Sequence, residues 1–305
     1  MGRRCEHDPV TRIAIVGGGR AATLHAEAAV ATAGVDLVGV GGRPGSAETL
    51  AAAAGVPDLP LAELAARADG LVIAVPAGAV PEVVAALPAD LPVLVESPVP
   101  LALAGVERPR AMTAANLLHA ATVKKGLRAI AGLGHAHHLV LRGRAIRRDG
   151  ASDLFAEPFA GAWPVLLMAA GAPVVAVAAT RTESTARAVL TLDDGRSPSA
   201  QFEWIGADDA VTAGTELEAA GATGVVTIGL WPTPRLEIDG REIADAEEHP
   251  LVALGFAEQI RRFAAMCDGR VEPWPPLSVG LGVSALTAAA NRSAAADGGD
   301  VATSG

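Results

Sequence analysis

The chain has 305 residues, of which half are hydrophobic and 3% aromatic; it contains no tyrosine and carries a formal charge of −10 at pH 7. This length accommodates two domains with a sizeable core, and the acidic balance argues against a nucleic-acid-binding surface. The apolar stretches are too short to cross a bilayer, so we expect no membrane partner. Two cysteines, Cys5 and Cys267, are too few for a disulfide framework. With no signal-peptide segment in view, these features predict a cytoplasmic protein.

The N-terminal segment predicts a strand, a glycine turn, a helix and a second strand. Residues 13–16 form an apolar run that suits a buried parallel strand. An Ala-rich helical segment over residues 21–31 follows, and residues 35–40 have the pattern of the second strand. Between the first strand and the helix, Gly17-Gly18-Gly19-Arg20-Ala21-Ala22 fits the G-x-G-x-x-G/A pattern of dinucleotide-binding turns.

Each position of this turn has a physical role in phosphate binding. Gly17 can take the tight turn, Gly19 leaves room for a pyrophosphate, and Ala22 keeps the helix close to the strand. The helix N-terminus, which begins near Arg20 and Ala21, offers unpaired N–H groups and the positive end of a dipole. A glycine-rich turn that binds nothing is the alternative, but the surrounding strands and helix favour a dinucleotide site.

The end of the second predicted strand bears on the choice of cofactor. An NAD site usually has an acidic residue there, which holds the ribose hydroxyls, but here the strand ends in Gly41-Gly42-Arg43. Asp36 comes too early, because it lies at the beginning of the strand. A guanidinium can pair with a 2′-phosphate and stack on adenine. We therefore expect Gly42 and Arg43 to contact NADP, with NAD possible if Arg43 is only a solvated loop residue.

Further short strands and helices extend this pattern through the first third of the chain. Residues 71–75, 92–95 and 111–116 read as strands that alternate with helices, which predicts a parallel sheet with right-handed crossovers. Ligands of such sheets bind beyond the carboxyl ends of the strands. The residues predicted to line this crevice beside the glycine turn are Val75, Pro76 and Glu96.

The pattern changes after about residue 117. Several segments of β character follow, with strong hairpin turns at Asp194-Gly195 and Asp239-Gly240, and helices are expected over residues 251–267 and 277–293. The fold class predicted is α/β, with a Rossmann-type parallel sheet in residues 1–117. Residues 118–305 are predicted to form an α+β domain with a mainly antiparallel open sheet.

Four stretches, in this order and spacing, resemble the glucose–fructose oxidoreductase / inositol dehydrogenase / MocA (Gfo/Idh/MocA) family. They are IAIVGGGRAATLHAEA, LVIAVPAGAVPEVVAAL, VLVESPVPLALAG and ALTAAANRSAAADGGDV. The resemblance implies a Rossmann domain followed by an α/β domain whose open sheet often forms dimers. It further implies an NAD(P)-dependent oxidoreductase of a small-molecule substrate, and a homodimer or higher homo-oligomer.

The chain differs from the family in the two motifs that carry the family's catalytic residues. The lysine of the family's E-K-P motif corresponds to Ser97 in Glu96-Ser97-Pro98, and serine can only donate a neutral hydrogen bond. The acid, histidine and second acid of its D-x-G-x-H-x-x-D motif correspond to Phe159, Trp163 and Leu166. One hypothesis is an oxidoreductase with non-standard catalytic residues that reduces an imine or a carbonyl compound. The alternative is a catalytically silent cofactor-binding regulatory or scaffold protein; a non-redox lyase or hydrolase has less in its favour.

Replacement catalytic residues can be named from position. His119 and Asn116 follow the last Rossmann strand, a junction that faces the nicotinamide in the family, so His119 is the candidate proton donor and Asn116 a candidate substrate contact. A helix-start histidine without a role is the alternative for His119. Ser97 is a candidate hydrogen-bond donor, and Trp163 is a candidate wall of an apolar substrate pocket. The histidines of Gly134-His135-Ala136-His137-His138 lack further ligands nearby, so no metal site is expected.

Overall fold

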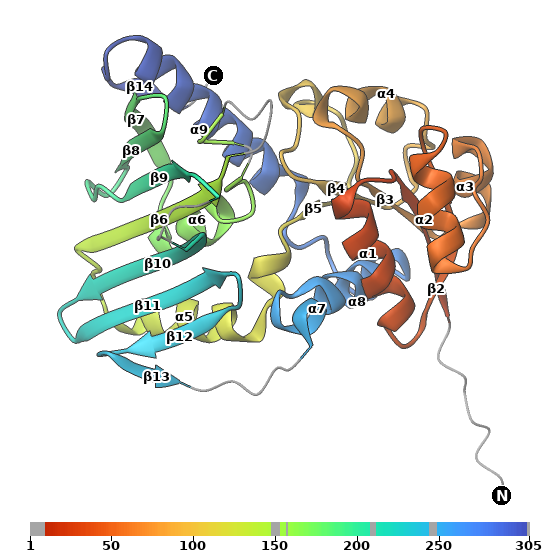
Figure 1. Cartoon of the computed structure of the whole chain (residues 1–305), viewed down its shortest axis with the longest axis horizontal. Coiled ribbons are helices and arrows are strands. Elements are labelled where there is room, and N and C mark those ends of the chain that lie inside the picture. The colour runs from red at the N-terminus through yellow and green to blue at the C-terminus, as the bar shows by residue number, and fades with distance from the viewer. Residues whose placement is uncertain (1–9, 148–152, 157, 208–211, 244–248, 304–305) are drawn as a thin grey trace, which may run out of the picture. The chain divides into compact units, whose positions relative to one another are not determined.

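The computed structural model describes residues 10–147, 153–156, 158–207, 212–243 and 249–303, so Cys5 lies outside it. The chain forms two compact units, and neither is one continuous stretch of sequence (Figure 1). Unit 1 consists of Met1–Glu96, Ala102–Ala114 and Phe256–Leu277, and unit 2 of Ser97–Leu101, Ala115–Gly255 and Ser278–Gly305. The expected boundary after residue 117 lies near one of the points where the chain passes between units, and residues 256–277 lie in unit 1.

A five-stranded parallel sheet forms the centre of unit 1, as the sequence predicts. Its strand order is β2-β1-β3-β4-β5. The chain therefore places β2 on one side of β1 and strands β3 to β5 on the other side. Ligands of parallel sheets bind at such a topological switch point. The strands are β1 (Thr11–Val16), β2 (Val35–Gly41), β3 (Gly70–Ile73), β4 (Val93–Glu96) and β5 (Ala111–Ala114).

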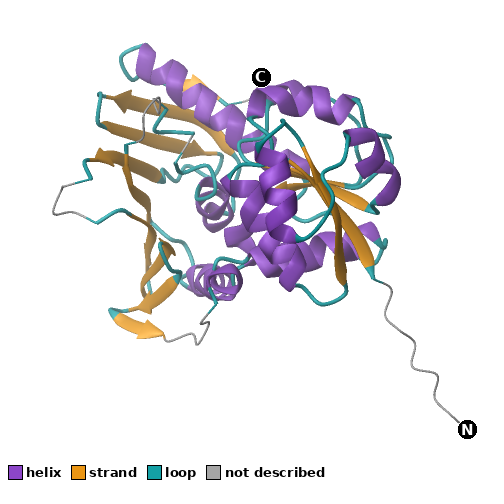
Figure 2. Ribbon diagram, turned by 45° about the vertical axis from the view of Figure 1, so that its right-hand side comes forward, coloured by secondary structure: helices purple, strands orange, loops and turns teal. Residues whose placement is uncertain are grey.

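Helices flank this sheet (Figure 2). Alanine-rich sequences favour them because alanine has the highest helix propensity, and a left-handed Gly55 ends α2. Proline at the start of α4 is tolerated because its missing N–H would be unpaired there in any case. The helices are α1 (Arg20–Ala31), α2 (Ser46–Ala54), α3 (Leu61–Arg67), α4 (Val80–Ala85) and α8 (Phe256–Cys267).

The single helix expected over residues 251–267 is wrong, because the chain breaks at Gly255. It forms α7 (Pro250–Ala253) in unit 2 and α8 in unit 1. Gly255 has a left-handed φ of 83°, and a Cβ there would overlap the carbonyl oxygen of Asn116. Apolar periodicity continues on both sides of this glycine, so the pattern alone does not reveal the break.

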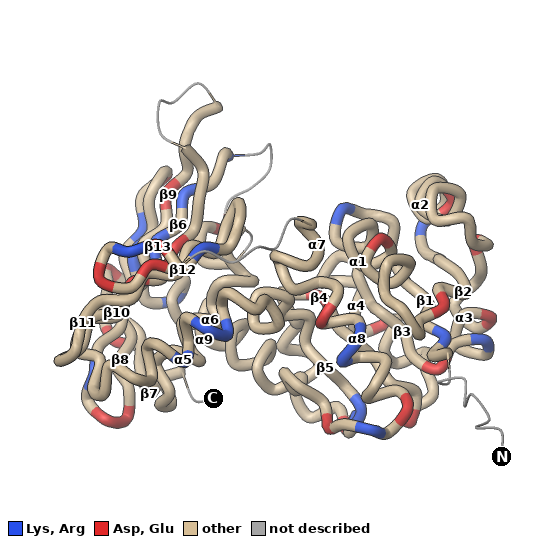
Figure 3. The backbone as a smooth tube through the Cα atoms, turned by 90° about the horizontal axis from the view of Figure 1, so that it is seen from below, with Lys and Arg blue, Asp and Glu red and all other residues tan. Residues whose placement is uncertain are grey.

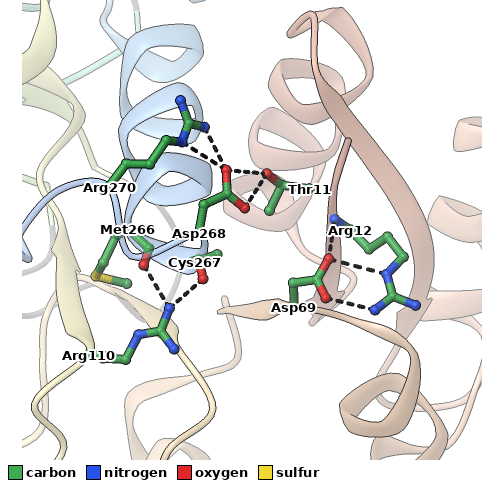
Figure 4. A network of polar contacts seen from close by, with 8 residues as sticks. All are labelled: Thr11, Arg12, Asp69, Arg110, Met266, Cys267, Asp268 and Arg270. Atoms are coloured by element: carbon green, nitrogen blue, oxygen red, sulfur yellow. Dashed lines mark hydrogen bonds and ion pairs between the residues drawn. The ribbon is translucent and has the colours of Figure 1, made fainter. Parts of the chain in front are cut away.

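Polar contacts tie the end of α8 to the strands of unit 1 (Figure 4). The Thr11 hydroxyl donates to Asp268, at 3.0 and 3.1 Å from the two carboxylate oxygens. The Arg110 guanidinium donates to the carbonyl oxygens of Met266 and Cys267. These contacts join residues more than 150 positions apart in sequence, so α8 is an integral part of unit 1.

Unit 2 contains a nine-stranded mixed sheet in the order β13-β12-β11-β10-β6-β9-β8-β7-β14. All its strand pairs are antiparallel except β6 with β9, which confirms the mainly antiparallel sheet predicted. The strands are β6 (His138–Ile146), β7 (Val174–Arg181), β8 (Thr185–Leu192), β9 (Ser199–Ile205), β10 (Gly214–Gly221), β11 (Gly224–Trp231), β12 (Arg235–Ile238), β13 (Arg241–Ile243) and β14 (Val301–Ala302).

Both predicted hairpin turns are present in this sheet. Gly195 adopts a φ of 84° between β8 and β9, while Asp239 and Gly240 have φ of 51° and 73° between β12 and β13. Asp and Gly tolerate this left-handed region better than other residues, which is why these dipeptides specify the turns.

Helices pack against the sheet of unit 2. Helices α5 and α6 pack against strands of the sheet, and a Cβ at Gly126 of α5 would overlap Ile228 of β11. The helices are α5 (Ala121–Gly132), α6 (Trp163–Ala170), α7 and α9 (Leu277–Ala295). No helix in the described ranges is both long and apolar enough to cross a membrane.

Arginine side chains of β6 and β12 lie near glutamate side chains of β9 and β10, and Figure 3 marks these charges along the backbone. Arg142 lies 3.6 Å from Glu218, and Arg144 lies 3.7 Å from Glu203. Arg235 lies 3.9 Å from Glu216. Arginines of β6 therefore lie near glutamates of both neighbouring strands, and Arg235 lies near Glu216 across the intervening strand β11, an arrangement of opposite charges that favours this register.

A candidate nucleotide-binding site and two substituted segments

Close packing fixes the backbone of the glycine turn of unit 1. Gly17 has a φ of 143°, and a Cβ there would overlap the carbonyl oxygen of Ala74. Its N–H donates to the carbonyl oxygen of Gly41 at 2.8 Å. Ala22 is fully buried where α1 meets the sheet. Glycine at position 17 and a small residue at position 22 are therefore dictated by packing.

Gly19 differs from its neighbours because a Cβ there would meet no atom within 4 Å. A Cβ at Gly18 would instead overlap the backbone of Ser46. Helix α1 begins with Arg20 and Ala21, directly after its N-cap residue Gly19, which has no side chain with which to cap the helix. Open space beside uncapped N–H groups at the carboxyl end of β1 fits a pyrophosphate.

The segment after β2 lies beside the same turn. A Cβ at Gly42 would approach the Cα of Gly17 to 3.5 Å. Arg43 is exposed, and its carbonyl oxygen accepts from the Ala47 N–H and the Ser46 hydroxyl, both at 3.3 Å. The guanidinium thus belongs to a short loop that is hydrogen-bonded to the start of α2. Asp36, in contrast, pairs with Arg12 at the beginning of the strands.

Sheet register brings a third segment to this edge. Val16, Ile73 and Val95 lie side by side on β1, β3 and β4, so the next residues of the three strands share a row. Those residues are Gly17, Ala74 and Glu96. Adjacent strands are about 4.8 Å apart, so Glu96 lies on the order of 10 Å from Gly17. Val75 and Pro76, partly and largely exposed respectively, follow β3 between them.

The Glu96 carboxylate is bonded to a histidine that the sequence analysis missed. His25 Nε2 lies 2.6 Å from Glu96 Oε2, and the histidine side chain is fully buried whereas that of Glu96 is 24% exposed. The His25 ring also meets the Phe256 ring edge-on, with centroids 5.5 Å apart. The available signal was an ionisable residue on the buried face of an otherwise alanine-rich helix.

The remaining predicted residues belong to unit 2. Ser97, the first residue after Glu96, is partly buried. Asn116 and His119 lie on a short 3-10 helix, where His119 is 2% exposed. The Asn116 side-chain amide donates to the carbonyl oxygen of Leu254 at 2.8 Å, so this amide stabilises the end of α7.

Trp163 lies in the aromatic core of unit 2. Its side chain is fully buried, and its ring N–H donates to the Phe155 carbonyl oxygen at 2.6 Å. The Trp163 ring meets the Phe202 ring edge-on, with centroids 5.4 Å apart. The Phe159 ring stacks on the Phe202 ring, with centroids 4.3 Å apart. Leu166 is also fully buried. This burial favours a packing role for Trp163, and its predicted contact with substrate stays a prediction.

The histidine-rich segment before β6 pairs one of its histidines with a glutamate of β10. His138 pairs with Glu218 at 3.0 Å, and within the described ranges no group of three His, Cys, Asp or Glu side chains could hold a metal ion. His138 therefore belongs to the cross-strand charge pattern of the sheet.

Comparison with known proteins identifies the first part of the chain. Residues 11–122 match the Gfo/Idh/MocA family model, described as an oxidoreductase family with an NAD-binding Rossmann fold. The matched segment contains the glycine turn, Arg43, Glu96 and both residues of the 116–119 helix named above. No curated protein matched the sequence in a separate comparison.

Solved structures share the fold over almost the whole chain. GenD2 from gentamicin A biosynthesis, solved in complex with NAD, is 23% identical with a TM-score of 0.78, covering 99% of each chain. A myo-inositol dehydrogenase from Corynebacterium glutamicum is 20% identical with a TM-score of 0.78, covering 96% of this chain and 98% of its own. An oxidoreductase domain protein from Kribbella flavida is 16% identical with a TM-score of 0.81, covering 98% and 100%. Residues 11–122 thus match the NAD-binding Rossmann fold of the Gfo/Idh/MocA oxidoreductase family, and the solved structures share the fold of almost the whole chain.

Proposed function

We propose that the protein is an NAD(P)-dependent oxidoreductase that acts on a small imine or carbonyl substrate. The observation that carries this proposal is the glycine turn, where open space at Gly19 adjoins the uncapped start of α1. A bound nicotinamide dinucleotide would supply the hydride donor or acceptor. Gly17, Gly19, Arg20, Ala21 and Ala22 would then form its pyrophosphate-binding turn.

NADP is the preferred cofactor in this proposal. The segment that follows β2 offers the Arg43 guanidinium and no carboxylate before Glu48. A guanidinium binds a phosphate through paired hydrogen bonds, and the fastened loop of Gly42 and Arg43 keeps it near the glycine turn. NAD remains the alternative because Arg43 is also compatible with a solvated role.

The decisive test is a fluorescence titration of cofactor-free protein with NADPH and NADH. We expect Arg43→Ala to weaken NADPH binding about tenfold, which is about 1.4 kcal/mol, and to change NADH binding less than twofold. Arg67→Ala is the matched control, since Arg67 is an exposed arginine of the same unit that pairs with Glu63 one helical turn away.

The outcomes test the choice of cofactor and the redox reaction separately. Equal weakening of both nucleotides by Arg43→Ala would contradict NADP selection, and binding of neither by the wild-type protein would overturn the redox proposal. If NADPH binds, imines and ketones are screened for substrate-dependent loss of its absorbance. Steady oxidation with any of them would establish turnover.

Two residues of unit 2 are proposed to act on the substrate. His119 is the candidate proton donor because imidazole exchanges a proton near neutral pH. Ser97 would donate a hydrogen bond in the position of the family lysine. Asn116 and Trp163 are the proposed substrate contacts. The side-chain amide of Asn116 and the ring N–H of Trp163 already donate to backbone carbonyl oxygens.

A catalytically silent cofactor-binding protein is the second candidate. The segment that corresponds to the family's acid–histidine–acid motif is here part of an apolar core, with Phe159, Trp163 and Leu166 at most 2% exposed. Ser97 removes the family's positive charge. Tight NADPH binding without turnover on any screened carbonyl or imine would favour this regulatory or scaffold role.

We also propose a homodimer or higher homo-oligomer in the cytoplasm. The arginine and glutamate side chains of β6, β9 and β10 offer a face on which two copies could pair opposite charges. Light scattering at low and high salt tests this: a dimer that dissociates as salt rises supports a charged interface, and a monomer at all salt concentrations contradicts it.

A further inference from the structure

The buried pair formed by His25 and Glu96 joins the nucleotide-binding helix to the end of β4. His25 belongs to the second turn of α1, and Glu96 is the last residue of its strand. The two are 71 positions apart in sequence. No residue role proposed above involves His25, although it is fully buried.

Hydrogen-bond satisfaction selects one form of the imidazole. An ionised carboxylate can only accept, so the 2.6 Å contact requires that His25 Nε2 carries the proton. His25 Nδ1 is buried without a hydrogen-bond partner among the described residues, and Phe256 covers the ring. The ring therefore acts as a fixed donor aimed at Glu96.

The position of Glu96 in the sheet indicates a role for the hydrogen bond from His25. Glu96 shares a row with Gly17, two strands away, and its side chain is partly exposed at the edge where dinucleotides bind. The adenosine end would lie beyond β2, near Arg43. A dinucleotide that crosses the switch point from β2 toward β4 brings its nicotinamide half to Glu96.

We propose that His25 is a positioning residue that presents the Glu96 carboxylate to the nicotinamide half of a bound dinucleotide. This inference rests on the proposed function. Without the His25 donor, the carboxylate loses the contact with α1 that fixes its orientation, so it no longer faces the nicotinamide half in one defined position. The adenosine half, which is bound at the other side of the glycine turn, is unaffected.

The test compares a whole dinucleotide with a fragment that lacks the nicotinamide half. In the full-length protein, His25→Leu is expected to weaken NADPH binding about tenfold and to leave adenosine 2′,5′-bisphosphate binding within twofold. His25→Gln, which can still donate to Glu96, should recover most of the NADPH affinity. Asp69→Asn is the matched control, since it breaks an ion pair with Arg12 at the opposite end of β1 and should change neither ligand.

A double-mutant cycle adds a readout that loss of packing would not produce. If His25 acts through the carboxylate, His25→Leu should weaken NADPH no further when Glu96→Gln is already present. Equal weakening of both ligands by His25→Leu would assign His25 to the turn itself, and unchanged NADPH affinity would show that it positions nothing; each result overturns the inference. Failure of the wild-type protein to bind either NADPH or NADH would instead overturn the proposed function.

Discussion

Partly buried side chains in unit 1 have contacts that set their chemical behaviour. Cys267 ends α8 under the start of β3, where a Cβ at Gly70 would overlap its sulfur. Burial raises the pKa of the Cys267 thiol to about 12, although the nearby Arg110 guanidinium favours the thiolate. The thiolate is the reactive form, so Cys267 is a packing residue rather than a nucleophile.

This environment predicts that Cys267 is inert in the folded protein. In a Cys5→Ser background, we expect no detectable reaction with a chromogenic disulfide at pH 8 over the time in which a free thiol reacts completely. One thiol per chain should react once the protein is unfolded in guanidinium chloride. Rapid stoichiometric reaction under native conditions would contradict the burial of the sulfur.

Helix ends in this chain depend on side chains from distant segments. Helix α4 is short and is followed by a loop whose carbonyl oxygens point toward Arg108. Its guanidinium donates to the carbonyls of Val84 and Leu87 at 2.7 and 2.8 Å, and to those of Pro88 and Leu91 at 2.9 and 3.2 Å. Burial lowers the pKa of Arg108, while Asp90 opposes this shift. One cation thus gathers carbonyl groups at and after the end of the helix, where backbone donors are few; those of Val84 and Pro88 also accept from the N–H groups of Leu87 and Leu91.

Removing this cation should destabilise unit 1. We expect Arg108→Ala to lower the free energy of unfolding by about 2 kcal/mol, because hydrogen bonds from a charged donor are lost at four carbonyls. Arg108→Lys should recover only part of the loss, since an ammonium lacks the planar fork.

Urea denaturation measures both variants of Arg108. Arg270→Ala is the control, because Arg270 is largely exposed and pairs with its near neighbour Asp268, so its removal should cost less than about 0.5 kcal/mol. A loss from Arg108→Ala no larger than that of the control would show that these carbonyls are equally well satisfied by water.

At the scale of the whole molecule, unit 1 is completed by a segment from near the end of the chain. Helix α8 packs against α1 and β1, and fully buried Phe263 projects from it. A Cβ at Gly70 would come within 2.9 Å of the Phe263 ring. The first 117 residues therefore lack one wall of their own core.

This arrangement predicts that residues 1–117 do not fold alone. We expect this fragment to be largely unfolded by circular dichroism and to bind no NADPH, because the surfaces under α8 would be exposed. A fusion of residues 1–114 through a flexible linker to residues 256–277 should recover cooperative unfolding. A stable, nucleotide-binding 1–117 fragment would show that α8 is dispensable.

The fold of both units could be predicted closely from sequence, and the candidate site only in part. The glycine turn, Arg43 and Glu96 were found because parallel strands deliver the residues after their carboxyl ends to one edge. His25 was missed because its significance depends on Glu96, which lies on another strand. The break at Gly255 was missed because apolar periodicity persists through it.

The sequence by itself determined the order of strands and helices, the glycine turn and the two Asp-Gly hairpins, since these depend on local periodicity and on residues that tolerate a left-handed backbone. Only the tertiary structure decided that α8 completes unit 1, that His25 holds Glu96, and that Trp163 is enclosed by Phe159 and Phe202. Each of these depends on contacts between residues remote in sequence or on complete burial of a side chain. No local pattern encodes such contacts, because packing between segments selects them.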